Sequence, residues 1–313
     1  MVKDIPDNPD PRAIFAPDAL EMLAPSHVLE GFRPVEQGIG ADFVRAQLLV
    51  PLAAALPNYE VRADLALRGR FKDAEWTASS GHICGVFAAP LFGIAPTARV
   101  VYLRFGCFQR WSRQQIVETL LILDLPSLLL QADVWPLALP LGPDLMAPPP
   151  LAGDGIWPVG EGKAALQIVE RMIGGLMKFD GTLATMNMRD YFAEDFWWFG
   201  PGPIGSFRGF SDYERGHAGP FLRAFPDRVG GNHRARFGNG DFVASTGWPS
   251  ITATHRGGGW LGLPATDRAI TMRVMDFWSA KGGMLIENWV MIDIPDLLHQ
   301  LGIDLFAAAT ERD

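Results

Sequence analysis

The chain has 313 residues, of which 48% are hydrophobic and 20% charged, and its formal net charge is −8. At roughly 150 residues per domain this length favours two domains, and the apolar content suffices for two cores, which excludes wholesale disorder. An acidic chain lacks the basic field that attracts phosphate backbones, so a nucleic-acid partner is not expected. The two cysteines, Cys84 and Cys107, provide neither a disulfide framework nor a Cys-rich zinc site.

The N-terminal residues, MVKDIPDNPDPR, carry acids and prolines where a signal peptide has a basic segment followed by an apolar one. No stretch of about 18 residues is uninterruptedly apolar, so no membrane-spanning segment is expected. The low cysteine content suits a reducing compartment. We therefore expect a cytoplasmic protein without a membrane partner.

The first half of the chain begins with this Pro/Asp-rich arm, followed by a weak strand pattern, HVLEGF, at residues 27–32. From there on, many residues recur 169 positions later, with no net insertion over about 100 residues. Matches at glycine, proline and charged positions are the informative ones, because chance does not supply so many of them. The first-copy members are Gly31, Pro34, Gly40, Pro51, Pro57, Gly69, Thr77, Gly93, Thr97, Arg104, Phe108, Glu118, Asp124, Pro126, Leu128, Leu129 and Gln131. We therefore predict two copies of one fold.

Between the copies, residues 137–158 are dense in Pro and Gly and almost without charge, which is typical of a semi-rigid linker. The chain is therefore expected to contain a first domain at 1–136, the linker at 137–158 and a second domain at 159–313. The second domain opens with apolar residues at helical spacing over Gly162–Lys178. Subtracting 169 from these positions runs off the front of the chain, so the first domain is expected to lack this helix.

The rest of the second domain shows helical patterns first and strand patterns afterwards. Helices are expected over 181–192 and 211–224, the latter ended by Pro226, with a short strand at 196–199 between them. Four strands and a short final helix follow, at 229–237, 242–255, 270–279, 284–293 and 295–301. Helices followed by an antiparallel meander indicate an α+β fold rather than the alternation of a parallel sheet.

The motifs of both copies resemble those of the SnoaL-like polyketide cyclases, which belong to the NTF2-like superfamily. The second copy has PFLRAFPD, STGWPS, WLGLPATDRAI and IENWVMID in this order, and the first has TASSGHICGVF, PLFGIAPTARVVYLRFGCFQRW and IVETLLILDLPSLL. These are similar to the family's aFPD helix end, TG-x-H-x-G strand, F-x-GIPPTG turn and E-x-W-x-x-x-D last strand. The resemblance covers nearly the whole chain, twice.

The resemblance implies two conical α+β barrels in tandem, each a curved antiparallel sheet wrapped over helices with an apolar pocket at its open end. Because such domains commonly pair through their sheets, an internal pseudo-twofold dimer is expected, and further homo-oligomerisation is left open. The first copy lacks a helix, so the better-formed pocket is expected in the second. The N-terminal arm or the Pro-rich linker would then cover the first sheet, since exposed apolar surface is costly.

Cyclisation by aldol chemistry requires a base that removes a proton from a carbon next to a carbonyl group. One carboxylate in a desolvated pocket can do this without a metal or a cofactor, because burial raises its pKa toward the working pH. The resemblance thus directs attention to the acidic residues near the last two strands.

Strand alternation places four residues on one face of the last strand: Glu287, Trp289, Met291 and Asp293. A three-residue turn at Lys281–Gly283 would align Arg273 and Phe277 with that face. A two-residue turn would align Asp276 with it instead, because a slip of one residue exchanges the two faces. The sequence leaves this register open.

Three of the charged residues recur in the first copy: Arg273, Glu287 and Asp293 match Arg104, Glu118 and Asp124. They are either an Arg–carboxylate network that holds the hairpin or part of a site. The resemblance favours Asp293, because the family uses a late-strand aspartate as its acid/base, yet its place before Pro295 also makes it a candidate N-cap. Asp276 replaces Cys107 of the first copy and is specific to the second.

His255 is a further catalytic candidate, and His217 and His233 are weaker ones. In the first copy His82 occupies the family's TG-x-H position, whereas the second copy has no histidine there. No pair of histidines has metal-ligand spacing, so neither a metal nor a cofactor is expected. Large apolar side chains would bind the substrate: Trp289, Phe277, Trp198, Trp248 and Met291.

The expected function is that of a cofactor-independent cyclase or isomerase, which acts on an apolar, polyketide-like carbonyl compound by carboxylate acid/base catalysis. Two alternatives remain, a non-catalytic module that binds small molecules and a hydratase or epoxide hydrolase in the same pocket. The state of the acid separates enzyme from binding module, because a catalytic carboxylate is buried in the pocket and is not fully paired with arginine.

Overall fold

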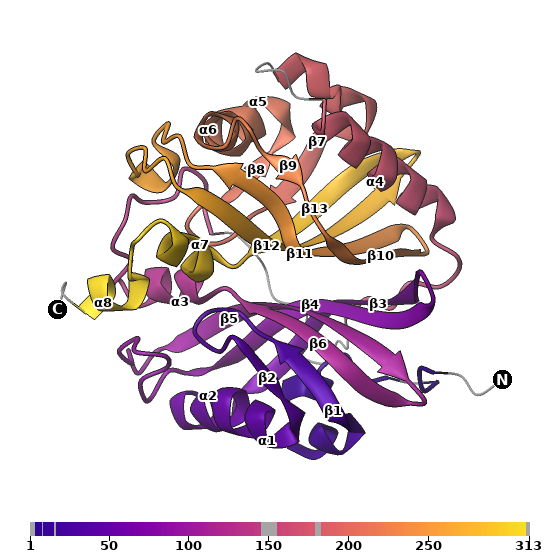
Figure 1. The fold of residues 1–313 in the computed structure, drawn as a ribbon, viewed down its shortest axis with the longest axis vertical. Helices are drawn as coiled ribbons and strands as arrows, with labels where there is room; N and C mark the ends of the chain where they lie inside the picture. The colour runs from indigo at the N-terminus through magenta and orange to yellow at the C-terminus, as the bar shows by residue number, and fades with distance from the viewer. Residues whose placement is uncertain (1–3, 8, 16, 145–154, 179–182, 311–313) are drawn as a thin grey trace. The chain divides into compact units, whose positions relative to one another are not determined.

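The structure is a computed structural model that describes residues 4–7, 9–15, 17–144, 155–178 and 183–310 (Figure 1). The chain forms two compact units. The first contains the residues up to 136, residues 155–157 and those from 304 onward, and the second contains the rest. Part of the expected linker, residues 145–154, lies outside the described residues, as do residues 181 and 182 of one expected helix.

The first unit is built on a six-stranded sheet in the order β2-β1-β6-β5-β4-β3, with β1 parallel to β6 and all other neighbours antiparallel. Its strands are β1 Leu23–Glu30, β2 Gln37–Ile39, β3 Glu60–Phe71, β4 Ala74–Val86, β5 Val100–Ser112 and β6 Gln115–Leu123. Its helices are α1 Gly40–Val44, a π-helical turn at Arg45–Leu49, α2 Val50–Ala55, α3 Leu125–Gln131, α8 Leu305–Thr310 and two 3-10 segments, Ala13–Phe15 and Pro17–Met22.

The second unit has a seven-stranded sheet in the order β10-β11-β12-β13-β7-β8, with β9 paired to β11. Its strands are β7 Phe192–Phe199, β8 Ser206–Arg208, β9 Val229–Gly230, β10 His233–Asn239, β11 Phe242–Thr254, β12 Ala269–Lys281 and β13 Met284–Ile292. Its helices are α4 Lys163–Leu176, α5 Gly209–Tyr213, a π-helical turn at Glu214–Ala218, α6 Gly219–Ala224, α7 Ile294–Gln300 and 3-10 segments at Leu183–Met186, Met188–Asp190 and Trp260–Gly262. Figure 1 shows α4, α5 and α6 on one face of this sheet.

The expected α+β order of elements is confirmed, with one difference in the sheets. The four long strands of each copy form the antiparallel meander, but the first strand pairs in parallel with the last, β1 with β6 and β7 with β13. The sheets are therefore mixed rather than antiparallel, because the chain passes through the helices before it returns to the meander. The segment expected to be helical at 181–192 is instead two short 3-10 segments that lead into β7.

The internal repeat extends to irregular features of the backbone. A π-helical turn interrupts the helix of each copy, at Arg45–Leu49 and again 169 residues later at Glu214–Ala218. Such turns are rare, so their recurrence at a fixed offset is strong support for two copies of one fold.

The hairpin between β12 and β13 settles the register that the sequence leaves open. Its turn has two residues, Gly282 and Gly283, both with positive φ as a type I′ turn requires. A bulge follows, because Ser279 pairs with Glu287 whereas the adjacent Ala280 pairs with Leu285. The extra residue on β13 places the same residues of β12 and β13 on a common face as a three-residue turn would. Phe277 therefore lies opposite Trp289. The first copy has the same turn at residues 113–114 and the same bulge.

The constant offset fails in the hairpin of β10 and β11. Gly81 of β4 pairs with Phe105, and Gly247 of β11 pairs with Val274. Phe105 and Val274 are 169 residues apart, but Gly81 and Gly247 are separated by only 166. The SG of the first copy therefore corresponds to the TG of the second.

The expected match of Thr77 with Thr246 is therefore wrong in the structure. The register of β11 shifts between Gly247 and Ile251, where three residues of β11 lie opposite one of β12. This irregularity restores most of the difference, so the offset returns to 169 by the start of β12. Compensating shifts of this kind are invisible to a gapless comparison of the two halves.

The N-terminal arm packs on the first sheet, where the first copy has no counterpart of α4. The ring of Phe15 lies edge-on against Phe105, with their centroids 4.7 Å apart. Tyr59 donates its hydroxyl to the carbonyl of Phe15 at 2.6 Å, and Ser79 donates to the carbonyl of Pro11 at 3.0 Å. At the β3 edge of the same sheet, Ile156 exchanges backbone hydrogen bonds with β3.

No helix among the described residues is long and apolar enough to cross a membrane.

Each copy fixes the start of its last helix with an ion-paired aspartate. Asp293 accepts a hydrogen bond from the backbone N–H of Asp296 at 3.2 Å and pairs with Arg273 at 3.1 Å. Asp124 likewise accepts from the N–H of Ser127 and pairs with Arg104. A side-chain oxygen that accepts from this N–H is the usual N-cap.

The two caps differ in burial, and this difference yields a prediction. Arg104 is 4% exposed, whereas Arg273 is 22% exposed and also lies 3.8 Å from Asp296. Asn caps almost as well as Asp, so an Asp-to-Asn change mainly removes the ion pair. We expect Asp124→Asn to lower the free energy of unfolding by about 3 kcal/mol, because it removes the carboxylate that pairs with a buried guanidinium. Asp293→Asn should lower it by about 1 kcal/mol.

Urea unfolding of both variants and of the unaltered chain, at one pH and salt concentration, measures this difference. Equal losses in the two variants, or a larger loss for Asp293→Asn, would contradict the account.

Candidate active site

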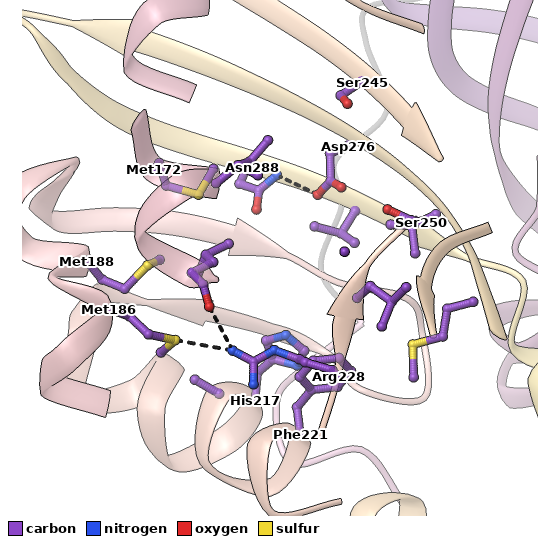
Figure 2. Close-up of a pocket in the computed structure, with 18 of the residues that line it drawn as sticks. Met172, Met186, Met188, His217, Phe221, Arg228, Ser245, Ser250, Asp276 and Asn288 are labelled. Atoms are coloured by element: carbon purple, nitrogen blue, oxygen red, sulfur yellow. Dashed lines mark hydrogen bonds between the residues drawn. The ribbon is translucent and has the colours of Figure 1, made fainter. Parts of the chain in front are cut away.

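The second unit encloses a cavity of about 200 Å³ between its sheet and its helices (Figure 2). The sheet wall includes alternate residues of two neighbouring strands, Val274, Asp276 and Trp278 from β12 and Asn288, Val290 and Ile292 from β13. These residues pair directly across the strands and share one face. The register fixed by the bulge therefore places Asn288, Val290 and Ile292 on the face of the sheet that carries Asp276.

Methionines make up much of the apolar lining. Met172 comes from α4, Met186 and Met188 from the segments before β7, and Met272 from β12. Unbranched, polarisable side chains of this type adapt to irregular apolar ligands. Trp198, Trp278 and Phe221 add flat aromatic surfaces to the same cavity. A flat, largely apolar molecule fits such a lining.

Asp276 is the acidic residue of the described lining. It is half-buried, and Asn288 donates to its Oδ1 at 3.4 Å while also donating to the carbonyl of Phe277 at 3.0 Å. Burial raises the pKa of Asp276 to about 7, although the bond from Asn288 and the charge of Arg236 act in the opposite direction. The carboxyl group is therefore close to half-ionised at neutral pH, as a general acid/base requires.

His217 and Tyr213 face the same cavity from the helical side. The imidazole of His217 stacks on Trp198, with ring centroids 4.0 Å apart, and burial lowers its pKa to about 3. Burial raises the pKa of the Tyr213 phenol, and the negative charge of Asp276 adds a smaller increase. Both groups are therefore neutral at physiological pH, and Asp276 is the group of these three that titrates there.

Arg228 contributes a positive charge to the cavity. Its Nη2 donates to the carbonyl of Leu176 at 3.2 Å and lies 3.4 Å from the sulfur of Met186, and burial lowers the pKa of its guanidinium. Figure 2 shows Arg228 at the opposite end of the cavity from Asp276. Within the described part of the chain, no three His, Cys, Asp or Glu side chains gather as they would around a metal ion.

Of the five leading catalytic candidates, Asp293, Glu287, Asp276, Arg273 and His255, the structure places only Asp276 in the lining of this cavity. Asp293 and Arg273 form the helix cap, and Glu287 accepts a hydrogen bond from Ser279 at 2.6 Å. His255 is buried elsewhere, where its Nδ1 lies 3.0 Å from the hydroxyl of Thr266. The resemblance points to Asp293, but the role of this residue in the structure is that of an N-cap.

Of the predicted substrate-binding residues, only Trp198 lines the cavity. Phe277, Trp289 and Met291 lie on the other face of the sheet, as their pairing with each other and with Met275 shows. Trp289 stacks on Phe199 at 5.8 Å, and Trp248 lies under the guanidinium of Arg273 at 5.3 Å. These four side chains belong to the packing around the sheet rather than to the cavity.

Several lining residues were missed by sequence reasoning. Asn288 stands between two residues of the family motif, and its position on the Asp276 face follows only once the register is known. Tyr213 lies at the end of α5, directly before the π-helical turn that carries His217. His217 and His233, the weaker candidates, do line the cavity.

The first unit lacks this set of polar groups. The strands β5 and β6 keep the 169-residue offset, so Cys107 corresponds to Asp276 and Thr119 to Asn288, and both are buried. Leu48, also buried, replaces His217 in the π-helical turn. The pocket acid is thus specific to the second unit.

Known families and proteins were compared with this chain to find its relatives. The model of the SnoaL-like polyketide cyclase family matches residues 181–301. No relative is found among curated proteins.

Solved structures resemble about half of the chain each. IdmH from Streptomyces antibioticus is 24% identical over 44% of this chain and 99% of its own, with a TM-score of 0.33. AclR from Streptomyces galilaeus is 21% identical over 45% of this chain and 85% of its own, with a TM-score of 0.36. An NTF2-like protein from Burkholderia xenovorans is 15% identical over 45% of this chain and 97% of its own, with a TM-score of 0.35.

The family match covers the second unit from the segment before β7 to the end of α7. The recurrent π-helical turn, hairpin bulge and helix cap extend the same architecture to the first unit. Residues 181–301 of the second unit therefore match the SnoaL-like polyketide cyclase family, and the first unit repeats the α+β fold of the second.

Proposed function

We propose that the second unit is a cofactor-independent cyclase or isomerase in which Asp276 is the acid/base. The observation that carries this proposal is that a cavity lined mostly by apolar side chains contains one described carboxyl group, with a pKa raised to about 7 by burial. An amide from Asn288, rather than an arginine, contacts this carboxyl. Such a group is poised to accept and return a proton at neutral pH.

The reaction that suits this site begins with proton abstraction. The Asp276 carboxylate takes the proton from a carbon next to a carbonyl group, and the C–H electron pair moves to form an enolate. The enolate carbon then attacks a second carbonyl of the same molecule, which forms the new C–C bond. Asp276, now protonated, returns its proton to the resulting alkoxide, so the acid/base is restored. With a β,γ-unsaturated ketone the enolate is a conjugated dienolate, and an isomerase would return the proton to its γ-carbon.

Donors within the lining support the stabilisation of an enolate oxygen. Tyr213 keeps its proton at neutral pH because its pKa is raised, and the guanidinium of Arg228 carries a positive charge into the cavity. Donors in a site shielded from water stabilise developing negative charge more strongly than in water. The apolar and aromatic lining supports a flat carbonyl compound as the substrate class.

The first test is the Asp276→Asn variant, with 2-tetralone as a flat ketone probe. We expect the unaltered chain to accelerate deuterium exchange at the carbons next to the ketone, followed by NMR in D₂O. Asp276→Asn should lose this acceleration, because an amide cannot accept the proton. Asp293→Asn is the matched control and should keep it, since its side chain caps α7 outside the cavity. Binding of the ketone without faster exchange in the unaltered chain would instead identify a binding module.

The same variant has a predicted effect on stability. The pKa of Asp276 is raised in the folded protein from 3.8 to about 7, so folding favours the protonated form. Stability should therefore fall as the pH rises between these values. At about 1.4 kcal/mol per pKa unit, the stability of Asp276→Asn relative to the unaltered chain should rise by up to about 4 kcal/mol between pH 4 and pH 8. A pH-independent difference in urea unfolding would contradict the raised pKa.

The pH dependence of turnover is the third test. If Asp276 acts as the carboxylate, the exchange rate at limiting probe concentration should rise tenfold per unit at low pH and level off above about 7. His217 cannot produce this profile, because its pKa is lowered to about 3. A rate that levels off near pH 4 would exclude the raised pKa of Asp276, and a rate that falls with pH would exclude its role as base.

A further inference from the structure

Arg236, Ser245 and Asp276 form a row across three neighbouring strands. Arg236 of β10 pairs with Ser245 of β11, which pairs with Asp276 of β12. Residues directly opposite one another share a face of the sheet, so all three side chains lie on the cavity side. Arg236 donates from Nε to the hydroxyl of Ser245 at 3.2 Å. Ser245 and Asp276 line the cavity, and Arg236 stands next in the row.

The guanidinium of Arg236 is held in a partly buried position. Burial lowers its pKa, and the negative charges of Glu170 and Asp276 act in the opposite direction. Its Nη2 is buried and makes no hydrogen bond to any residue that the structure describes. A desolvated cation with an incompletely used guanidinium interacts strongly with nearby negative charge, because little water screens it.

The first unit shows the same row without its charges. Ser79 of β4 pairs with Cys107, the counterpart of Asp276, and with Ala66 of β3. Ser79 therefore takes the place of Ser245, and Ala66 that of Arg236. The serine is present in both copies, whereas the arginine and the aspartate are present only together. This joint occurrence indicates that the two charges serve one purpose.

We propose that Arg236 is a positioning residue for Asp276: its guanidinium, oriented by Ser245, supplies the positive charge that stabilises the Asp276 carboxylate from beside the pocket. This inference rests on the proposed function, in which Asp276 must be available as a carboxylate at neutral pH. The same charge opposes the desolvation that would otherwise keep the carboxyl protonated. Arg236 itself does not touch the substrate in this account.

Other titratable groups near the row do not replace Arg236 in this role. His217 and His233 are neutral at physiological pH, since burial lowers their pKa values to about 3 and about 4, and Tyr213 is neutral because its pKa is raised. Glu170 of α4 acts on Arg236. Arg228 lies at the other end of the cavity, where its charge acts on Tyr213 (Figure 2).

The test is the titration of the Asp276 carboxyl carbon, followed by NMR in the full chain labelled with ¹³C-aspartate and assigned with Asp276→Asn. In Arg236→Met we expect the midpoint to move upward by about one pH unit, because a nearby positive charge is lost. The acid limb of the exchange-rate profile should move in the same direction by the same amount. Arg236→Lys keeps the positive charge, so its midpoint should lie close to that of the unaltered chain. Arg208→Met removes an exposed arginine from the edge strand β8 and should leave the midpoint unchanged.

An unchanged midpoint in Arg236→Met, or a shift of equal size in Arg208→Met, would overturn the inference. If Arg236→Met fails to fold, Arg236→Gln takes its place, because it keeps a donor for Ser245 and removes the charge. The same upward movement of the Asp276 midpoint is expected in that variant. The titration does not depend on turnover, so the two proposals fail separately. A shifted midpoint together with full exchange activity in Asp276→Asn would refute the proposed function and leave the role of Arg236 standing.

Discussion

The pairing of β12 with β13 decides which side chains meet in the cavity of the second unit. Two glycines with positive φ allow a two-residue turn, and the bulge that follows moves β13 by one residue. Without that bulge, the residues of β13 that now share a face with Asp276 would lie on the opposite face of the sheet. Asn288 would then no longer lie beside Asp276. The contact of Asp276 with Asn288 depends on this register, whereas its place in the row with Arg236 is set by the pairing of β12 with β11 and of β11 with β10. The same turn and bulge in the first unit show that the register belongs to the fold, whereas the charges are an addition to it.

The architecture could be predicted from the sequence because the repeat is marked by residues with strict backbone or capping roles. Glycine, proline and ion-paired positions recur in both copies, and they mark the turns, helix ends and caps of a common fold. The limit of the comparison was the hairpin of β10 and β11, where the alignment is already shifted by three residues at Gly247 and the irregularity that follows returns most of this shift. For this reason the correspondence of Arg236 with Ala66 could not be found by subtracting a constant.

The residues of the site were harder to predict from the sequence than the fold. Asp293 matches the family motif and recurs as Asp124, and the structure shows that the shared feature is a helix cap with an arginine partner. Recurrence in both copies thus marked a structural role. Asp276 was the acid that differed between the copies, and it is the one that lines the cavity. Which residues of β13 share its face follows from a bulge at one residue, and no propensity or periodicity in the sequence specifies that bulge.

Burial is what gives the Asp276 carboxyl its proposed chemistry, and the pKa of this one group in the unaltered chain tests the account most directly. A pH titration of its carboxyl carbon by ¹³C NMR reports the ionisation of the side chain itself, without a substrate or an assay of activity. The account predicts a midpoint at about 7. A midpoint near 4, the ordinary range of a solvated aspartate, would show that the carboxyl is not desolvated in the cavity and would contradict the central claim.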